Sequence, residues 1–451
     1  MRKITLFVLI LLITSFSLRA QRKPSTVPAA AGVSASTMER VVKALAADDM
    51  QGRAVDKPGN EKAAQYLAGE FNRIGLAKLP GLTSYEQTFP AYESRVVALF
   101  VTLNGISVPR NKLLLVSSKP HLNWTDEDEP VTRIVTVGPQ EKLEQHMSDI
   151  MHPHENLIVL LSPIHARPFK RLAHHIKNNS LRADKEGSPF SSLVVLTTAP
   201  SSPKVKFQVA GNTTLRTLEL RNIVGVLPGK DANRAAEQVI FSSHYDHLGI
   251  LDPMMGDSIA NGANDNASGT AAVVALAEYF KRKNDNGRTL VFVAFTAKEA
   301  GGFGSAYFAK QIDPTKVAVM LNLEMIGQSS KFGPNTAFVT GFTKSNVGLI
   351  LQAGVKGTPF RFESDPYPEL NLFYHSDNAA LARVGVPAHS ISTHQIPTDK
   401  LYRSVEDEVQ SLDFPNMTAV ATALARGAAN IVAGQQTPSR ITPEMAEQKK
   451  H

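Results

Sequence analysis

The sequence contains no cysteine and no long run of apolar residues. Without cysteine, the 451-residue chain can form neither disulfide bonds nor thiolate metal ligands, so its stability must come from core burial. The longest apolar run, residues 4–16, has 13 residues, whereas a membrane-spanning helix needs about 20. The hydrophobic fraction of 43% and the charged fraction of 20% are ordinary for globular proteins. These features exclude a membrane-embedded or largely disordered protein and leave enough chain for two or three domains.

The first 20 residues have the pattern of a secretory signal peptide. Arg2 and Lys3 precede the apolar run, and the segment of residues 17–20 that follows it begins with Ser17 and ends with the small residue Ala20. We expect cleavage after Ala20, a linker over residues 21–35, and a secreted or periplasmic protein with no membrane attachment after cleavage. A short membrane anchor is the alternative, because Leu18 is bulkier than the small residue usually found there. The segment holds three basic and no acidic residues, so its removal lowers the formal net charge from +7 to +4. This charge, with no basic stripe among aromatic residues, argues against nucleic-acid binding.

The rest of the chain is predicted to form an α/β fold, with a mostly parallel sheet covered by helices on both faces. Apolar residues recur at helical spacing before Gly75 and again over residues 267–283 and 414–432. Buried strands are expected at residues 222–227, 238–243, 289–295, 317–323 and 387–391. Short apolar runs separated by polar segments predict an inserted strand-rich domain over residues 91–217. Residues 434–451 lack apolar periodicity and are expected to be a disordered tail.

Candidate metal ligands follow three of the predicted strands. His244 ends one strand, Glu299 follows the next, and Glu324 follows a third. Asp265 lies in a segment of small residues before a helix, where an ordinary helix cap is the alternative explanation. Asp246 lies two residues beyond His244, close enough in an extended segment to orient the imidazole. Ligands bind at the carboxyl ends of strands in α/β sheets, so these side chains are expected to form one site there. Nitrogen and oxygen donors without thiolate favour a hydrolytic zinc ion in that site.

These segments resemble the co-catalytic zinc aminopeptidase family, which includes bacterial leucyl aminopeptidase and, more distantly, glutamate carboxypeptidase and glutaminyl cyclases. The matching segments are residues 49–53, 222–229, 244–246, 262–269, 295–296, Glu299, residues 304–305, 322–325, 374–377 and 385–388. The resemblance implies a zinc aminopeptidase-like domain formed by residues 36–90 and 218–433. It also places the insert where many members carry a protease-associated domain.

The resemblance also implies a role for each candidate. Asp265 would bridge two zinc ions, His244 and Glu324 would complete one of them, and Glu299 with a later histidine would complete the other. Glu324 stands where the family usually has aspartate. Asp246 would orient the imidazole of His244 without itself binding zinc.

Two positions depart from the family pattern. Lys298 occupies the place of the glutamate that serves as general base, and an ammonium cannot accept a proton unless its pKa falls by several units. Arg403 occupies the place of the last histidine ligand, and arginine keeps its proton and cannot bind zinc. His394 and His375 are the histidines that could take over this ligand position.

Two functions remain open from the sequence. The first is an exported zinc metallopeptidase of the aminopeptidase type, which removes N-terminal residues from peptides with one or two zinc ions. The second is a non-catalytic or single-zinc descendant of the same fold that binds peptide or protein. The substrate preference, the oligomeric state and the role of the insert do not follow from the sequence.

Overall fold

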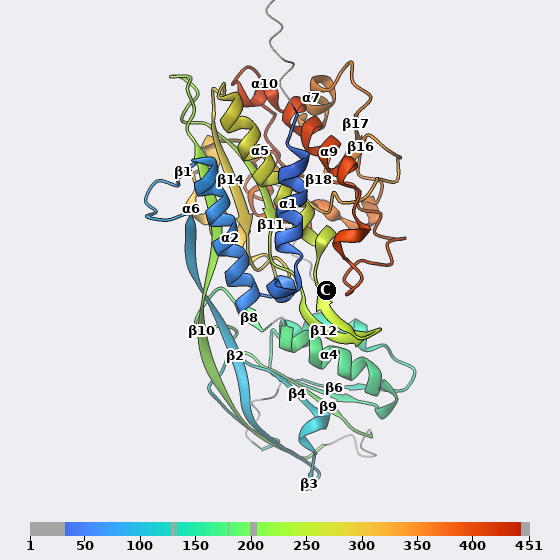
Figure 1. Ribbon diagram of the computed structural model, residues 1–451. Coiled ribbons are helices and arrows are strands. Elements are labelled where there is room, and N and C mark those ends of the chain that lie inside the picture. The colour runs from blue at the N-terminus through green and yellow to red at the C-terminus, as the bar shows by residue number, and fades with distance from the viewer. Residues whose placement is uncertain (1–31, 128–130, 132, 179, 199–204, 443–451) are drawn as a thin grey trace, which may run out of the picture. The chain divides into compact units, whose positions relative to one another are not determined.

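A mixed β-sheet forms the centre of the computed structural model, which describes residues 32–127, 131, 133–178, 180–198 and 205–442 (Figure 1). Its strand order is β17-β16-β18-β15-β11-β14-β10-β2-β3. Strands β14, β11, β15 and β18 run parallel, whereas β10 beside β14 and β16 beside β18 run antiparallel. The bounds are β2 Glu86–Leu103, β3 Ile106–Ser107, β10 Phe207–Leu227, β11 Gln238–His244, β14 Thr289–Phe295, β15 Val317–Leu323, β16 Thr336–Val339, β17 Arg361–Ser364 and β18 Ala388–Ser392.

Helices cover both faces of this sheet, which confirms the predicted fold class. Neighbouring strand residues point to opposite faces, so Phe241 packs in one core and Ile240 in the other. The larger core joins the sheet to α1 (Ala35–Leu45), α2 (Pro58–Ile74), α5 (Gly269–Lys283), α7 (Val347–Gly354) and α9 (Phe414–Gly427). The opposite core holds residues of α6 (Phe303–Gln311) and α8 (Ala379–Ala382).

Local signals explain where the first helices begin and end. The Ser34 hydroxyl accepts the backbone N–H of Thr37 at 3.1 Å, which caps the start of α1. Gly75 ends α2 with a φ of 76°, a left-handed conformation that glycine adopts without steric cost. α9 is followed by the short helix α10 (Ala429–Val432), where the sequence predicts one helix.

The insert is joined to the core by two long paired strands. β2 and β10 pair from Glu86 and Ile223 in the core sheet to Leu103 and Phe207 in the insert. The expected boundaries at residues 91 and 217 therefore fall inside continuous strands. By its contacts, the chain from Val33 onward is a single unit.

The insert contains a second sheet with helices against it. The sheet has the order β4-β9-β7-β6, with bounds β4 Leu113–Val116, β9 Ser192–Leu196, β7 Leu157–Leu161 and β6 Arg133–Val137. Phe169 and Leu172 of α4 (Ala166–Asn178) and Ile150 of α3 (Met147–Met151) pack on it. Short strands β1 (Ala77–Lys78), β5 (His121–Thr125) and β8 (Leu181–Arg182) add to the central sheet, and β12 (Gly249–Met254) pairs with β13 (Asp257–Ala260).

The structure bears on the prediction for the C-terminal end of the chain but not on the one for residues 1–20. The predicted signal peptide and most of the linker lie outside the described residues. Residues 434–442 pack against the domain, because Ile441 is buried and Arg440 donates to the Val317 carbonyl at 2.9 Å. The prediction of a disordered tail is wrong for these residues, and residues 443–451 are not described. Among the described residues, none of the helices has the length and apolar character needed to cross a membrane.

Candidate metal centre

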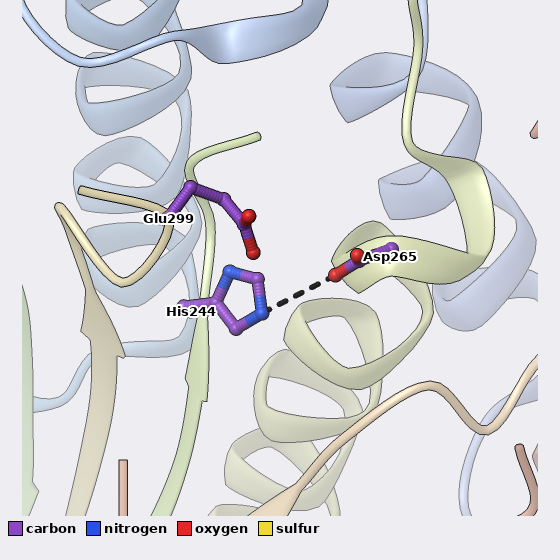
Figure 2. Close-up of side chains that lie close together, drawn as sticks. All are labelled: His244, Asp265 and Glu299. Carbon is purple, nitrogen blue, oxygen red and sulfur yellow. Dashed lines mark ion pairs between the residues drawn. The ribbon is translucent and has the colours of Figure 1, made fainter. Parts of the chain in front are cut away.

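The predicted ligands meet at the carboxyl edge of the central sheet. His244 is the last residue of β11, Glu324 follows β15, and Glu299 lies in the loop after β14. β14, β11 and β15 are parallel neighbours, so their carboxyl ends share one edge. Asp265 reaches the same place from the segment that precedes α5 (Figure 2).

Two donor distances at His244 match those around one tetrahedral zinc ion. His244 Nε2 lies 3.4 Å from Asp265 Oδ1 and 3.2 Å from Glu324 Oε1. Zinc bonds of about 2.0–2.1 Å give a tetrahedron with edges of about 3.3–3.4 Å. Neither oxygen of the fully buried Asp265 accepts a hydrogen bond among the described residues. Because a buried carboxylate without a partner is costly, this donor set fits a cation.

Asp246 contacts His244 mainly through its backbone, whereas the sequence analysis expected its carboxylate to orient the imidazole. The nearer acceptor for His244 Nδ1 is the Asp246 backbone carbonyl at 3.1 Å, whereas the Asp246 carboxylate lies at 3.6 Å. Since a carbonyl oxygen only accepts, Nδ1 donates to it, and Nε2 is the nitrogen left to face a metal. The Asp246 carboxylate instead accepts the backbone N–H groups of Lys298 at 3.1 Å and Glu299 at 3.0 Å. It thereby ties the loop after β14 to the end of β11.

The acidic cluster favours positive charge at His244. Burial and Lys298 act to lower the pKa of His244, but Glu324, Asp246 and Asp265 outweigh them and raise this pKa well above its usual value. This positive charge comes either from protonation of the imidazole ring or from a bound cation. A cation that binds to the ring must displace its proton.

Two buried residues that sequence reasoning did not single out hold the segment carrying Asp265. The Asp407 carboxylate accepts the backbone N–H of Asn264 at 2.7 Å and that of Asp265 at 2.9 Å. The fully buried Arg53 donates to four carbonyls, those of Leu45, Tyr245, Asn261 and Gly262. Arg53 therefore fixes the loop after β11 to the segment before α5, which explains why residues 49–53 belong to the recognisable pattern.

The comparison with known families agrees with this arrangement. Residues 222–428 match the model of peptidase family M28. This region is an M28 domain. The matched range contains all four candidate ligands and the parallel strands that carry three of them. Residues 36–90 and the whole insert, residues 91–217, lie outside it.

Individual relatives are similar to parts of the chain. A probable zinc metalloprotease of Pyricularia oryzae is 36% identical over 116 residues, which are 25% of this chain and 22% of the relative. A probable leucine aminopeptidase of Arthroderma otae is 28% identical over 206 residues, 44% of this chain and 52% of the relative. The chain thus spans about a fifth to a half of the length of these relatives.

Solved structures show the same fold at low sequence identity. An aminopeptidase from Aneurinibacillus sp. strain AM-1 superposes with a TM-score of 0.54 at 16% identity, covering 91% of this chain and 96% of that one. A zinc aminopeptidase from Bacillus subtilis gives the same TM-score at 15% identity, covering 91% and 98%.

Two cations of the chain itself surround Glu299, on one side of the candidate metal centre. Lys298 Nζ lies 2.9 Å from Glu299 Oε1 and 3.3 Å from Glu324 Oε1. The Arg403 guanidinium forms an ion pair with the other oxygen of Glu299. Glu299 still lies near His244 and Asp265, with one donor atom of each residue within 4.8 Å of the others. Both oxygens of Glu299 are thus paired with cations of the chain.

Glu299, Lys298 and Arg403 stabilise one another in their charged forms. Burial acts to raise the pKa of Glu299, but Lys298 and Arg403 hold it at about 2. Burial acts to lower the pKa of Lys298, but Glu299, Glu324 and Asp265 raise it well above its usual value. This is the opposite of the shift that a lysine would need to serve as a general base.

Among the described residues, neither histidine named as a replacement ligand is recorded in a hydrogen bond or ion pair with a candidate ligand. His394 Nε2 pairs with Asp399 Oδ2 at 2.9 Å and its ring packs on Tyr402, whereas His375 is exposed. His247, which the sequence analysis assigned no role, is closer. Its ring is buried, its Nδ1 lies 3.8 Å from Asp265 Oδ2, and neither ring nitrogen has a hydrogen-bond partner among the described residues. Burial lowers the pKa of His247 to about 4, so the ring is neutral at neutral pH.

Proposed function

We propose that this chain is a zinc-binding M28 protein that binds peptides at the candidate metal centre and does not hydrolyse them at the rate of an aminopeptidase. One observation carries the proposal. Both carboxylate oxygens of Glu299 are paired with cations of the chain, Lys298 and Arg403. These cations stand where the aminopeptidases that the sequence resembles have a general base and a zinc ligand.

A single zinc ion is the metal that the donor set supports. His244, Asp265 and Glu324 would hold it, and their 3.2 and 3.4 Å donor distances suit its tetrahedral geometry. The names of relatives, a zinc metalloprotease and a zinc aminopeptidase, agree with this choice. Bound zinc would supply a Lewis acid for a peptide carbonyl.

We expect a loss of hydrolysis because Lys298 cannot accept the proton that the reaction must transfer. Hydrolysis needs a group that takes a proton from water and returns it to the leaving amine. The Lys298 ammonium already holds its proton, and its carboxylate partners strengthen that hold. A general base contributes about 10²–10⁴-fold to rate, so we expect hydrolysis to fall by at least this factor.

Peptides with a free N-terminus are the ligands we propose. The support is the fold shared with solved aminopeptidases and the similarity to a probable leucine aminopeptidase.

An active aminopeptidase is the second candidate, and His247 is the observation that favours it. A neutral imidazole beside Asp265 Oδ2 could serve a second metal ion in place of the missing histidine. Such a site would require Glu299 to exchange its cations for the metal.

We also propose that the protein is exported. The support is the sequence of residues 1–20, with Arg2 and Lys3 before the apolar run and Ala20 at its end.

Calorimetry and a turnover assay on the same preparation test the proposed function. The zinc-loaded chain should bind short peptides, leave them intact and give background turnover of aminoacyl chromogenic substrates. His244→Ala should lose the zinc, whereas His375→Ala, a change at an exposed histidine, should retain it. Zinc-dependent turnover by the unmodified chain would support the second candidate, and absence of peptide binding would contradict the proposal.

A further inference from the structure

One edge of strand β2 is open in the insert. On one side β2 pairs with β10, in the long ribbon that runs from the core sheet into the insert (Figure 1). On its other side β2 pairs with β8 through Tyr92 and Glu93, and with β3 through Thr102 and Leu103. Between these two contacts, no strand of the described residues pairs with residues 94–100. We call residues 94–100 the open edge.

The backbone of the open edge has hydrogen-bonding groups that face away from β10. Thr213 of β10 lies opposite Val96, and its N–H donates to the Pro120 carbonyl on the β5 side of β10 at 2.9 Å. Opposite residues of an antiparallel pair either exchange hydrogen bonds or both direct these groups away from each other. The N–H and carbonyl of Val96 therefore point outward, and none of the described residues pairs with them there. Unpaired groups of this kind are a template for a further strand.

The open edge is only partly protected against pairing. Bulges and charged side chains are the usual protection of an exposed edge. Val97 is an extra residue that shifts the register of β2 against β10, and Arg95 pairs with Glu93 at 2.8 Å. The exposed large side chains are apolar, however, because Val97 is 60% and Phe100 73% exposed. A strand added at the open edge would gain apolar contacts as well as backbone hydrogen bonds.

Space for an added strand lies at the end of the open edge nearer to β8. Ser94 and Val96 line a cavity of about 840 Å³ there. Its other walls combine apolar side chains and serine hydroxyls with five titratable residues: His152, His154, His175, Arg182 and Asp184. Such mixed walls favour no single kind of side chain, so the backbone of the ligand is the group that this site can recognise.

The length of the open edge decides what can occupy it. Its seven residues span about 23 Å at about 3.3 Å per residue. Strand β2 of a second copy does not fit, because its 18 residues would continue into the positions that β8 and β3 already fill. A short extended segment fits between β8 and β3.

We propose that the open edge binds a short extended segment of another polypeptide as an added β-strand. Backbone hydrogen bonds supply the affinity in this mode of recognition, and pockets for side chains supply selectivity. None of the candidate metal ligands lines the cavity beside the open edge. The insert is thus a docking site of its own, which depends neither on zinc nor on peptide binding at the candidate metal centre.

Hydrogen exchange at the Val96 amide tests the inference on the full chain. The probe is a seven-residue peptide of alternating threonine and valine, with a glutamate added at each end for solubility and both termini capped. Fluorescence anisotropy of the labelled probe gives its dissociation constant. At ten times this concentration, the probe should slow exchange by about tenfold. The same peptide with every amide N-methylated can donate no backbone hydrogen bond and should give no protection.

Position 96 provides a matched pair of variants. Val96→Pro removes the outward N–H at an edge, where proline is tolerated, and should weaken probe binding by about tenfold. Val96→Thr keeps the N–H and the β-branched shape, so it should bind the probe like the unmodified chain. Thermal unfolding of both variants verifies the fold. The N-methylated peptide tests the same hydrogen bonds without any change to the protein.

Four outcomes would overturn the inference. Slow exchange at Val96 without the probe would mean that the chain itself covers the open edge. Equal protection by the N-methylated peptide, or unchanged binding by Val96→Pro, would show that side chains rather than backbone groups hold the probe. Protection that grows with protein concentration and accompanies dimerisation would assign the open edge to a second copy.

The candidate metal centre is tested separately. The capped probe has no free N-terminus, and His244→Ala should bind it as the unmodified chain does. Loss of probe binding in His244→Ala would place the probe at the metal centre and overturn the inference. Failure of zinc-dependent peptide binding would contradict the proposed function and leave the open edge unaffected.

Discussion

The Lys298 ammonium supplies positive charge that stabilises two largely buried carboxylates. It lies 2.9 Å from Glu299 and 3.3 Å from Glu324. At an effective dielectric constant of about 20, a unit charge attracts each carboxylate by about 5–6 kcal/mol at these distances. Desolvation of the ions offsets much of this attraction, and breaking a buried pair by removing one partner typically costs about 3–5 kcal/mol. We therefore predict that Lys298→Met lowers the free energy of unfolding by about 3–5 kcal/mol in a metal chelator.

Zinc should reduce this loss. A zinc ion would neutralise Asp265 and Glu324, whose negative charge Lys298 otherwise balances. Zinc should therefore stabilise Lys298→Met more than it stabilises the unmodified chain. Denaturant unfolding with and without zinc measures the four free energies. Lys283→Met is the control, because Lys283 forms a surface pair with Asp285 at 3.0 Å and such pairs contribute about 0–1 kcal/mol. An equal loss for both variants, or a loss at Lys298 that zinc does not change, would refute the assignment of Lys298 as a built-in counterion.

Three further predictions concern the altered site positions, the N-terminus and Glu70. The double variant Lys298→Glu with Arg403→His should raise zinc content and turnover more than the two single changes combined, because base and ligand act as one unit; additive effects would contradict this. N-terminal sequencing of the exported protein should find Gln21 first, and an intact Met1 chain in the membrane fraction would count against export. Burial acts to raise the pKa of Glu70, but its two arginine partners lower it, so Glu70→Gln should cost about 1–3 kcal/mol at pH 7. Since a lowered pKa stabilises the fold only where the group ionises, acid unfolding series should show this cost shrinking below about pH 4.5, and a constant cost would be inconsistent with it.

The core of the fold follows from local sequence signals. Strands such as β14 are apolar throughout and lie between turn residues, so both their position and their burial on two faces could be predicted. In the insert, α4 was missed although Phe169, Leu172 and Ile176 recur at helical spacing. Its many charged residues cover the solvent side of the helix and obscured that pattern.

The candidate site was predictable where ligands follow strands. Parallel strand order brings the ends of β11, β14 and β15 together, so His244, Glu299 and Glu324 could be grouped from sequence. The contacts of Asp407 with residues 264–265 cross more than 140 positions, and no local pattern encodes them. The position of His247 beside Asp265 likewise depends on a turn, because Gly262 at φ 58° packs against its ring where a Cβ would clash.

The number of zinc ions bound per chain distinguishes one metal position from two. The central claim is that Lys298 and Arg403 have replaced one metal position and that His244, Asp265 and Glu324 retain the other. Metal analysis of the purified mature protein, after zinc loading and dialysis against a weak chelator, should find one zinc ion per chain. Two retained zinc ions, with turnover abolished by Asp265→Ala, would contradict the account and would indicate that another histidine, with His247 nearest, restores the second position.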